Sequence, residues 1–276
     1  MRHDCLMLLT DYGAEGGYVG VLHAVAHRIA PGARVIDVDH GIAPHDVRLG
    51  ALRLERTMPY MPDGVHVAVV DPGVGSDRRG VAVVAGGGSH VLVGPDNGLL
   101  AWAADACGGA DDVVVLDRPE FWLTPRSSTF DGRDVFMPVG AHLATGVPVR
   151  QVGTAVDPAG LVVLSRPLVH VLGDGAVELE VLQIDRFGNL QLSGDAATAA
   201  TMGLAPGDPV RVVSDDPPIT RPARFGRTFA DVGEGELVLL VDSDGCLALS
   251  INRGSAATVL AREGGTGSTL RLVAGR

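Results

Sequence analysis

The sequence has 276 residues and a mass of 28.5 kDa, which is long enough for two modest domains, and its 46% hydrophobic content is typical of a globular protein. A formal net charge of −11 and a pI near 5.2 argue against a nucleic-acid partner, which would favour a basic face. A small cationic substrate is compatible with this acidity, although acidity is more often a matter of solubility. The three cysteines lie far apart and match no ligand spacing, so we expect free thiols.

The N-terminal segment M-R-H-D-C-L-M-L-L-T-D contains an apolar run that is too short for a signal peptide or a membrane span. We therefore expect a cytoplasmic protein that does not contact membranes.

The first half of the chain alternates between strand-like and helix-like segments. Continuous apolar runs at 5–10, 34–38 and 65–70 are typical of strands buried on both faces, whereas 18–30 and 46–58 carry apolar residues at helical spacing. This alternation predicts an α/β domain with a largely parallel sheet. The glycine-rich centre of residues 80–94 predicts a hairpin.

After residue 148 the pattern changes to short β-type runs divided by Gly, Pro and Asp. Helical periodicity is nearly absent, which predicts a smaller all-β, barrel-like domain. Residues 166–175 are the best linker candidate, so the expected domains are 1–168 and 169–276. The runs lie at 161–164, 176–184, 209–213, 237–241, 246–251 and 269–273.

Three of the expected strands end in an aspartate followed closely by glycine, namely Asp11, Asp39 and Asp71. Ligands of open α/β sheets bind outside the carboxyl ends of the strands, so the recurrence favours a site there. One such aspartate alone would more simply begin a turn or cap a helix.

The loop D-P-G-V-G-S-D-R-R-G at 71–80 has glycines that let backbone N–H groups face a ligand, and two arginines that can pair with a carboxylate. It lacks the G-K-[ST] of a P-loop, and a phosphate-binding nest is the alternative interpretation.

Two histidine pairs raise the question of a metal. His23 and His27 lie four apart on an expected helix, without the glutamate of an H-E-x-x-H motif, so a surface or packed helix face explains them best. His40 and His45, each beside an aspartate, are a better candidate for a metal-binding cluster, but such residues also occur readily in loops.

Two further loops lie in the expected β domain. In I-D-R-F-G-N-L (184–190), the carboxylate and amide suit an amino group or an adenine edge, and Phe187 could stack on a base; a plain turn is the alternative. V-D-S-D-G-C-L (241–247) predicts a hairpin turn.

Taken in order, eight motifs resemble the S-adenosyl-L-methionine (SAM) hydroxide adenosyltransferases, a family formerly called a domain of unknown function and related to the fluorinase and chlorinase. The resemblance runs from about residue 6 to residue 257. The motifs are L-L-T-D-Y-G, Y-V-G-V-L-H-A-V, I-A-P-H-D-V-R-L-G-A, V-V-D-P-G-V-G-S-D-R-R-G, V-G-P-D-N-G-L-L, S-T-F-D-G-R-D-V-F, I-D-R-F-G-N-L and S-I-N-R-G-S-A-A.

The resemblance implies an N-terminal α/β domain, a C-terminal barrel-like domain, and a homotrimer with sites between the N-domain of one subunit and the C-domain of the next. It implies in-line attack of water or hydroxide on the ribose 5′ carbon of SAM, releasing adenosine and L-methionine. It implies no metal and no other cofactor.

The resemblance also assigns substrate contacts. Asp11 matches the aspartate that holds the two ribose hydroxyls, a bidentate fit. His45 falls where the fluorinase has tryptophan, and Phe130 belongs to the wall of the nucleoside pocket. The contacts expected in the second domain are Asp185 and Ser243 to the methionine amino and carboxylate groups, Asn189 to adenine, Phe187 for stacking, and backbone groups of Ile251 and Arg253 at the adenine edge.

The halogenases and the hydroxide enzymes differ at the position of Asp71, where halogenases carry tyrosine. This chain has the aspartate of the hydroxide enzymes, with Arg78 at their spacing. A carboxylate there would repel a halide, whereas it can orient a water and accept its proton. A halide-using synthase and a non-catalytic SAM- or adenosine-binding protein are the alternatives.

Asp131 departs from the family pattern, because the hydroxide enzymes carry histidine there and the halogenases tyrosine. Three interpretations stand. Asp131 replaces the histidine as a partner of the water, with Arg78 between it and Asp71; or Asp71 and Arg78 suffice for catalysis; or the protein binds the nucleoside and turns it over poorly or not at all.

Overall fold

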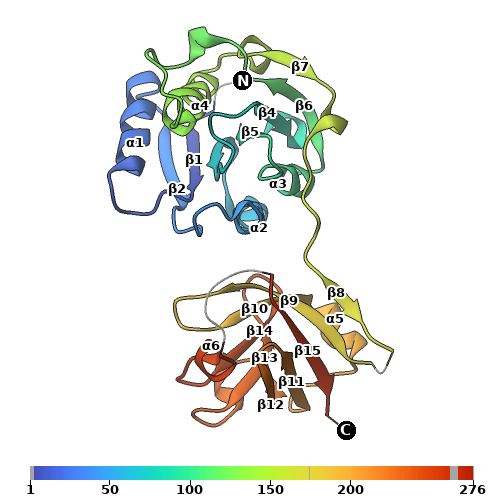
Figure 1. Cartoon of the computed structure of the whole chain (residues 1–276). Coiled ribbons are helices and arrows are strands. Elements are labelled where there is room, and N and C mark those ends of the chain that lie inside the picture. The colour runs from blue at the N-terminus through green and yellow to red at the C-terminus, as the bar shows by residue number, and fades with distance from the viewer. Residues whose placement is uncertain (1–2, 174, 262–266, 276) are drawn as a thin grey trace. The chain divides into compact units, whose positions relative to one another are not determined.

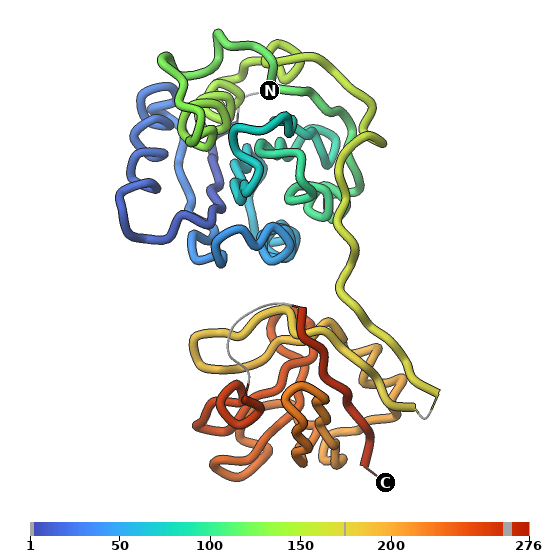
Figure 2. Tube along the Cα trace, viewed as in Figure 1, coloured from blue at the N-terminus to red at the C-terminus, as the bar shows by residue number. Residues whose placement is uncertain are grey.

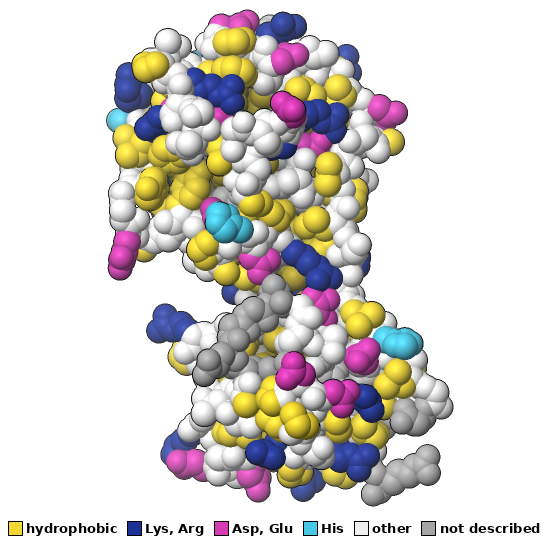
Figure 3. All heavy atoms as spheres, viewed as in Figure 1, with side chains coloured by type: hydrophobic (Ala, Val, Ile, Leu, Met, Phe, Trp, Pro, Cys, Tyr) yellow, Lys and Arg dark blue, Asp and Glu magenta, His cyan; other side chains and the backbone are white. Residues whose placement is uncertain are grey.

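The computed structural model describes residues 3–173, 175–261 and 267–275. The chain divides into two units, 1–164 and 165–276, and its trace passes once from the first to the second (Figure 2). Within the described ranges, no helix is long and apolar enough to cross a membrane. The drawn face of each unit carries scattered charges of both signs (Figure 3).

The first unit contains one seven-stranded sheet in the order β2-β1-β3-β5-β4-β6-β7 (Figure 1). The first four strands in this order are parallel, whereas β4, β6 and β7 add antiparallel pairings at the other side. The strands are β1 (Cys5–Thr10), β2 (Arg34–Asp39), β3 (Gly64–Val69), β4 (Gly80–Ala85), β5 (His90–Pro95), β6 (Ala110–Val115) and β7 (Thr154–Val156).

Helices cover both faces of this sheet, because successive strand residues point to opposite sides. Leu8 of β1 belongs to the cluster that α1 and α4 cover, whereas its neighbour Leu9 belongs to the cluster with α2 and α3. The parallel strands are thus buried on both faces, as their continuous apolar sequences predict. The helices are α1 (Tyr18–Ile29), α2 (Val47–Thr57), α3 (Ala101–Ala106) and α4 (Met137–Ala144).

The second unit is a closed seven-stranded β-barrel in the order β10-β14-β13-β12-β11-β15-β9, closed by the β9–β10 pairing. Strand β8 pairs with β9 beyond this ring, and β12–β13 is a parallel pairing among antiparallel ones. The elements are β8 (Val169–Val171), β9 (Val177–Ile184), β10 (Leu190–Asp195), α5 (Ala196–Thr201), β11 (Pro209–Asp215), β12 (Pro218–Phe225), β13 (Leu237–Val241), β14 (Cys246–Ile251), α6 (Ala256–Val259) and β15 (Thr269–Ala274).

The predicted fold class is confirmed for both units, and so is the hairpin formed by β4 and β5. The expected strand at 161–164 is wrong: this segment has no strand pairing, and the N–H of Val162 donates to the carboxylate of Asp96 instead. Part of the expected linker, Val169–Val171, is strand β8, which pairs with β9 outside the closed ring. Strand β12 was missed because prolines at 218 and 222 argue against a strand.

Candidate functional site

A cavity of about 420 Å³ lies in the first unit, beyond the carboxyl ends of β1 and β3. Parallel strands deliver their following residues to the same edge, so Asp11 after β1 and Asp71 after β3 both line it. Asp39, at the end of β2, does not line it: its carboxylate accepts from the N–H of Gly41 at 2.7 Å. The lining residues are Asp11, Tyr12, Tyr18, Pro44, His45, Asp71, Val74, Thr129, Phe130, Asp131 and Gly132.

Asp71, Arg78 and Asp131 form one hydrogen-bonded array at this cavity. The Nε of Arg78 donates to both oxygens of Asp71, at 2.9 and 3.0 Å, and its Nη2 donates to Asp71 and, at 2.7 Å, to the Oδ2 of Asp131. The two carboxylate side chains are only 6% and 3% exposed. One guanidinium thus lies between two buried carboxylates and donates to both. Its planar fork of donors can bind the two groups while keeping their negative charges apart.

Arg78 is fixed as a cation by this arrangement. Burial lowers its pKa, but hydrogen bonds and charges from Asp71 and Asp131 outweigh burial and raise the pKa further. Its guanidinium also lies 5.0 Å from the ring centroid of Phe136. The array therefore holds two carboxylates and one positive charge in a fixed relative geometry.

Asp131 immediately precedes a π-helical turn (Gly132–Phe136) that leads into α4. Irregular helical turns of this kind are frequent at functional sites. A Cβ on Gly132 would lie 2.2 Å from the hydroxyl oxygen of Tyr12, so glycine is required for the phenol to pack here. The turn thus presents Asp131 next to an aromatic wall.

That wall consists of Tyr12, Tyr18 and Phe130. The ring centroids of Tyr12 and Tyr18 both lie 5.5 Å from that of Phe130, and they lie 5.9 Å from each other. Burial, followed by the charges of Asp11, Asp71 and Asp131, raises the pKa of Tyr12, which therefore stays a neutral phenol. Three aromatic faces beside three carboxylates suit a ligand that is flat at one end and cationic at the other.

Asp11 is held against the loop that carries His45. The backbone N–H of His45 donates to Asp11 Oδ2 at 3.0 Å, and His45 has φ 70°, a left-handed conformation that is uncommon outside glycine. The strained backbone turns the N–H towards the carboxylate while the side chain faces the cavity edge. The loop conformation therefore matters to Asp11 more than the histidine ring does.

A chain of hydrogen bonds supports the end of β1 from the other side. Buried Thr10 shares a hydrogen bond of 2.8 Å with His40, which bonds Asp37 at 3.0 Å; His23 bonds the same oxygen at 2.8 Å. Burial raises the pKa of Asp37, but the hydrogen bonds from His40 and His23 outweigh it and lower the pKa.

Among the described residues, no group of three or more His, Cys, Asp or Glu could hold a metal ion.

In the second unit, Asp185 organises the loop between β9 and β10. Its carboxylate accepts from the N–H groups of Phe187 and Asn189, at 2.8 and 2.9 Å, and from the Asn189 side-chain amide at 2.7 Å. The Phe187 side chain stands out from this loop and is 67% exposed. The loop is thus pre-shaped, with an aromatic ring available for a ligand.

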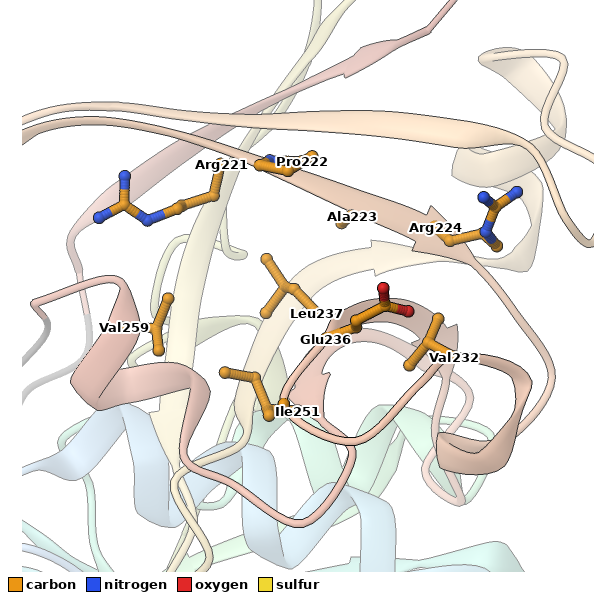
Figure 4. Close-up of a pocket in the computed structure, with 10 residues that line it drawn as sticks. Arg221, Pro222, Ala223, Arg224, Val232, Glu236, Leu237, Ile251 and Val259 are labelled. Carbon is orange, nitrogen blue, oxygen red and sulfur yellow. The ribbon is translucent and has the colours of Figure 1, made fainter.

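The other expected contact residues of the second unit differ in exposure and in location. Ser243 is exposed in the turn between β13 and β14, which confirms the predicted hairpin, and Arg253 pairs with exposed Glu234 at 3.2 Å. Ile251 is buried and lines a cavity of about 330 Å³ at the barrel, beneath Arg221 and Arg224 (Figure 4). The other five expected residues are not among those that line this cavity.

Sequence reasoning missed Tyr12, Tyr18 and Arg126. The two tyrosines stand in motifs that carried the resemblance, L-L-T-D-Y-G and Y-V-G-V, so their positions were visible but their packing was not. Arg126 has no signal in the sequence: it lies five residues before Asp131 in an irregular loop, and only the folded chain brings the two together. Arg133, by contrast, pairs with its neighbour Asp134 at 2.6 Å.

Both units of the chain match models of one protein family. Residues 6–153 match the model of the SAM hydroxide adenosyltransferase N-terminal domain, and residues 179–268 match that of the C-terminal domain. The chain belongs to the SAM hydroxide adenosyltransferase family. This confirms the resemblance on which the sequence-based assignments rest.

Two relatives have names that state a reaction. The chain is 51% identical over 267 residues, 96% of each chain, to the (R)-S-adenosyl-L-methionine hydrolase of Salinispora arenicola. It is 29% identical to the fluorinase of Actinopolyspora mzabensis, over 91% of this chain and 92% of that one. The crystal structure of an uncharacterized conserved protein from Thermotoga maritima matches with a TM-score of 0.87 and 32% identity, covering 97% of this chain and 99% of that one.

Proposed function

We propose that this protein hydrolyses (R)-S-adenosyl-L-methionine to adenosine and L-methionine. The observation that carries the proposal is the array of Asp71, Arg78 and Asp131 at a cavity that Asp11 also lines. Three carboxylates facing one cavity attract a sulfonium cation and disfavour a halide anion. The names of the relatives at higher identity support the same reaction.

In the proposed step, the oxygen of a water attacks the ribose 5′ carbon as the bond from that carbon to sulfur breaks. The bonding electron pair goes to sulfur, which becomes the neutral thioether of methionine, and the water proton goes to Asp71 and then to solvent. Asp71 is the proposed base because it lines the cavity while Arg78 fixes the orientation of its carboxylate. Arg78 is proposed to act through that carboxylate.

The reaction as proposed uses no metal and no organic cofactor. The sulfonium is already an activated leaving group, so orientation of water and substrate supplies the remaining help. Asp11 is proposed to accept from the ribose hydroxyls, and the wall of Tyr12, Tyr18 and Phe130 to pack on the nucleoside and face the sulfonium.

We also propose that the working form is a homotrimer in which Asp185, Asn189, Phe187 and Ser243 of one subunit complete the cavity of the next. The division of the expected contacts between the two units supports this proposal. Mixing the inactive variants Asp71→Asn and Asp185→Asn tests it. Random reassembly would restore up to about a quarter of the sites, since each restored site takes its two halves from different subunits; no recovery after reassembly would oppose it.

The activity is tested by incubating purified protein with SAM and separating the products by chromatography, with Asp71→Asn as the matched control. Formation of adenosine and methionine by the wild type alone supports the proposal. Appearance of 5′-chloro-5′-deoxyadenosine in high chloride would support halogenation instead. Saturable binding of SAM without any product would identify a binding protein.

A further inference from the structure

Asp131 is held by two arginines, and the second of them is not part of the array described so far. The Nε and Nη2 of Arg126 both donate to Oδ1 of Asp131, at 3.0 and 2.8 Å. The other oxygen, Oδ2, accepts from Arg78 at 2.7 Å. Each carboxylate oxygen of Asp131 therefore has its own guanidinium.

We propose that Arg126 is a positioning residue for the reaction, and that it makes an aspartate workable at position 131. The inference rests on the proposed function. Through Asp131, Arg126 fixes the Nη2 of Arg78, which donates to Asp71 as well as to Asp131, and so sets the orientation of the Asp71 carboxylate towards the water. Arg126 does not line the cavity and acts only through Asp131.

Charge explains why a second arginine is needed. Asp71 and Asp131 are buried, and Arg78 supplies one positive charge for two negative ones. Among the described residues that line the cavity, the other titratable groups are Asp11, Tyr12, Tyr18 and His45. Of these, only His45 can carry a positive charge, and its backbone N–H is bound to Asp11. Arg133 is occupied by Asp134, whose pKa is raised by burial but lowered more strongly by Arg133 and the N–H of Ser127. Arg126 is thus the residue that balances the second buried carboxylate.

Packing orders Arg126 although its side chain is 41% exposed. Its guanidinium lies 4.7 Å from the ring centroid of Trp122, and this contact restricts the side chain. Its partner carboxylate is only 3% exposed, so solvent screens mainly one end of the ion pair. Two donors of one guanidinium on the same carboxylate oxygen restrict the direction of the contact as well as supplying charge.

This geometry favours the second interpretation of Asp131, in which Asp71 and Arg78 carry the catalysis. Asp71 and Asp131 each accept three guanidinium hydrogen bonds, but those of Asp71 come from Arg78 alone, whereas those of Asp131 come from two arginines. The second cation favours the charged carboxylate, so Asp131 is the weaker base of the two. It serves as the link between Arg78 and Arg126, while Asp71 keeps the role of the base. A neutral histidine at this position would carry no buried negative charge and would need no second cation.

The test is a double-mutant cycle with R126Q, R126K, D131H and the double variant R126Q/D131H, using adenosine formation as the assay. In the wild-type background, R126Q is expected to lower kcat by between about ten- and a hundredfold with KM nearly unchanged, since misplacement of a catalytic group has this scale. R126K, which keeps the charge, is expected to recover part of the loss. In the D131H background, R126Q is expected to change kcat less than about threefold.

Two of these results separate positioning from a merely structural role. The loss in R126Q falls on kcat with KM nearly unchanged, and R126K, which keeps the charge, recovers part of it. Equal loss of kcat in both backgrounds, or less than a twofold loss in the first, would overturn the inference.

The two failures can be told apart. If the wild type forms no adenosine, the proposed function fails, and the thermal midpoints of the same proteins decide the role of Arg126. A midpoint lowered by R126Q in the wild-type background but not in D131H supports the pairing. An equal shift in both backgrounds overturns it.

Discussion

Replacing Arg78 with methionine would leave two carboxylates buried without their shared cation. The methionine fills similar space against Phe136 but donates nothing to Asp71 or Asp131, whose side chains are 6% and 3% exposed. Removing one partner of a buried ion pair costs about 3–5 kcal/mol of unfolding free energy. Arg126 still pairs with Asp131, so we expect a loss at pH 8 towards the lower end of that range.

Urea unfolding followed by tryptophan fluorescence measures this loss in the correct unit, because both tryptophans, Trp102 and Trp122, lie in residues 1–164. Arg150→Met is the matched control: Arg150 pairs with Asp112 at the surface with its side chain 74% exposed, and its replacement should leave the midpoint unchanged. A loss below about 1 kcal/mol for Arg78→Met, in the range of ordinary surface substitutions, would refute the account of a buried array held by one arginine.

Three other substitutions test separate parts of the account. Gly132→Ala places a Cβ where the Tyr12 hydroxyl lies, so we expect a destabilisation of about 1–3 kcal/mol in the urea assay together with weaker substrate binding; unchanged stability would contradict the close contact. Asp11→Asn should raise KM by about tenfold with a smaller change in kcat, because it removes a charged acceptor for the ribose hydroxyls, and an unchanged KM would argue against that role. Burial, with the charges of His90 and His3, lowers the pKa of His66 to about 3. As pH falls from about 6.5 towards 3, this histidine binds a proton in the unfolded chain but not in the folded one, so the free energy of unfolding decreases. The thermal midpoint of His66→Gln should therefore fall less steeply with acid than that of the wild type, and identical slopes would contradict this origin.

Much of the fold was predictable because the local patterns agree with the tertiary structure. The continuous apolar run at Cys5–Thr10 is buried on both faces of the sheet, and α1 ends just before Pro31. Strand β12 was not predictable, since its two prolines remove hydrogen-bond donors and its pairings come from β11 and β13. The expected strand at 161–164 was wrong because this apolar run has no strand pairing, and its two valines are exposed.

The candidate site also has residues that the sequence places correctly and contacts that only the structure shows. Strand ends are readable from sequence, so Asp11 and Asp71 could be placed at one edge of the sheet before the structure was known. The contact between Arg126 and Asp131 depends on the path of an irregular loop, and the aromatic wall depends on how three rings pack. Neither leaves a periodic pattern, so neither could be derived from residue spacing.

The most direct test of the central claim is hydrolysis of SAM in water enriched in oxygen-18, with mass spectrometry of the products. If water attacks the ribose 5′ carbon, the account predicts adenosine that carries the heavy isotope at its 5′ hydroxyl, together with unlabelled methionine. Products of cleavage at any other bond to sulfur, such as 5′-methylthioadenosine, or adenosine without the isotope, would contradict it.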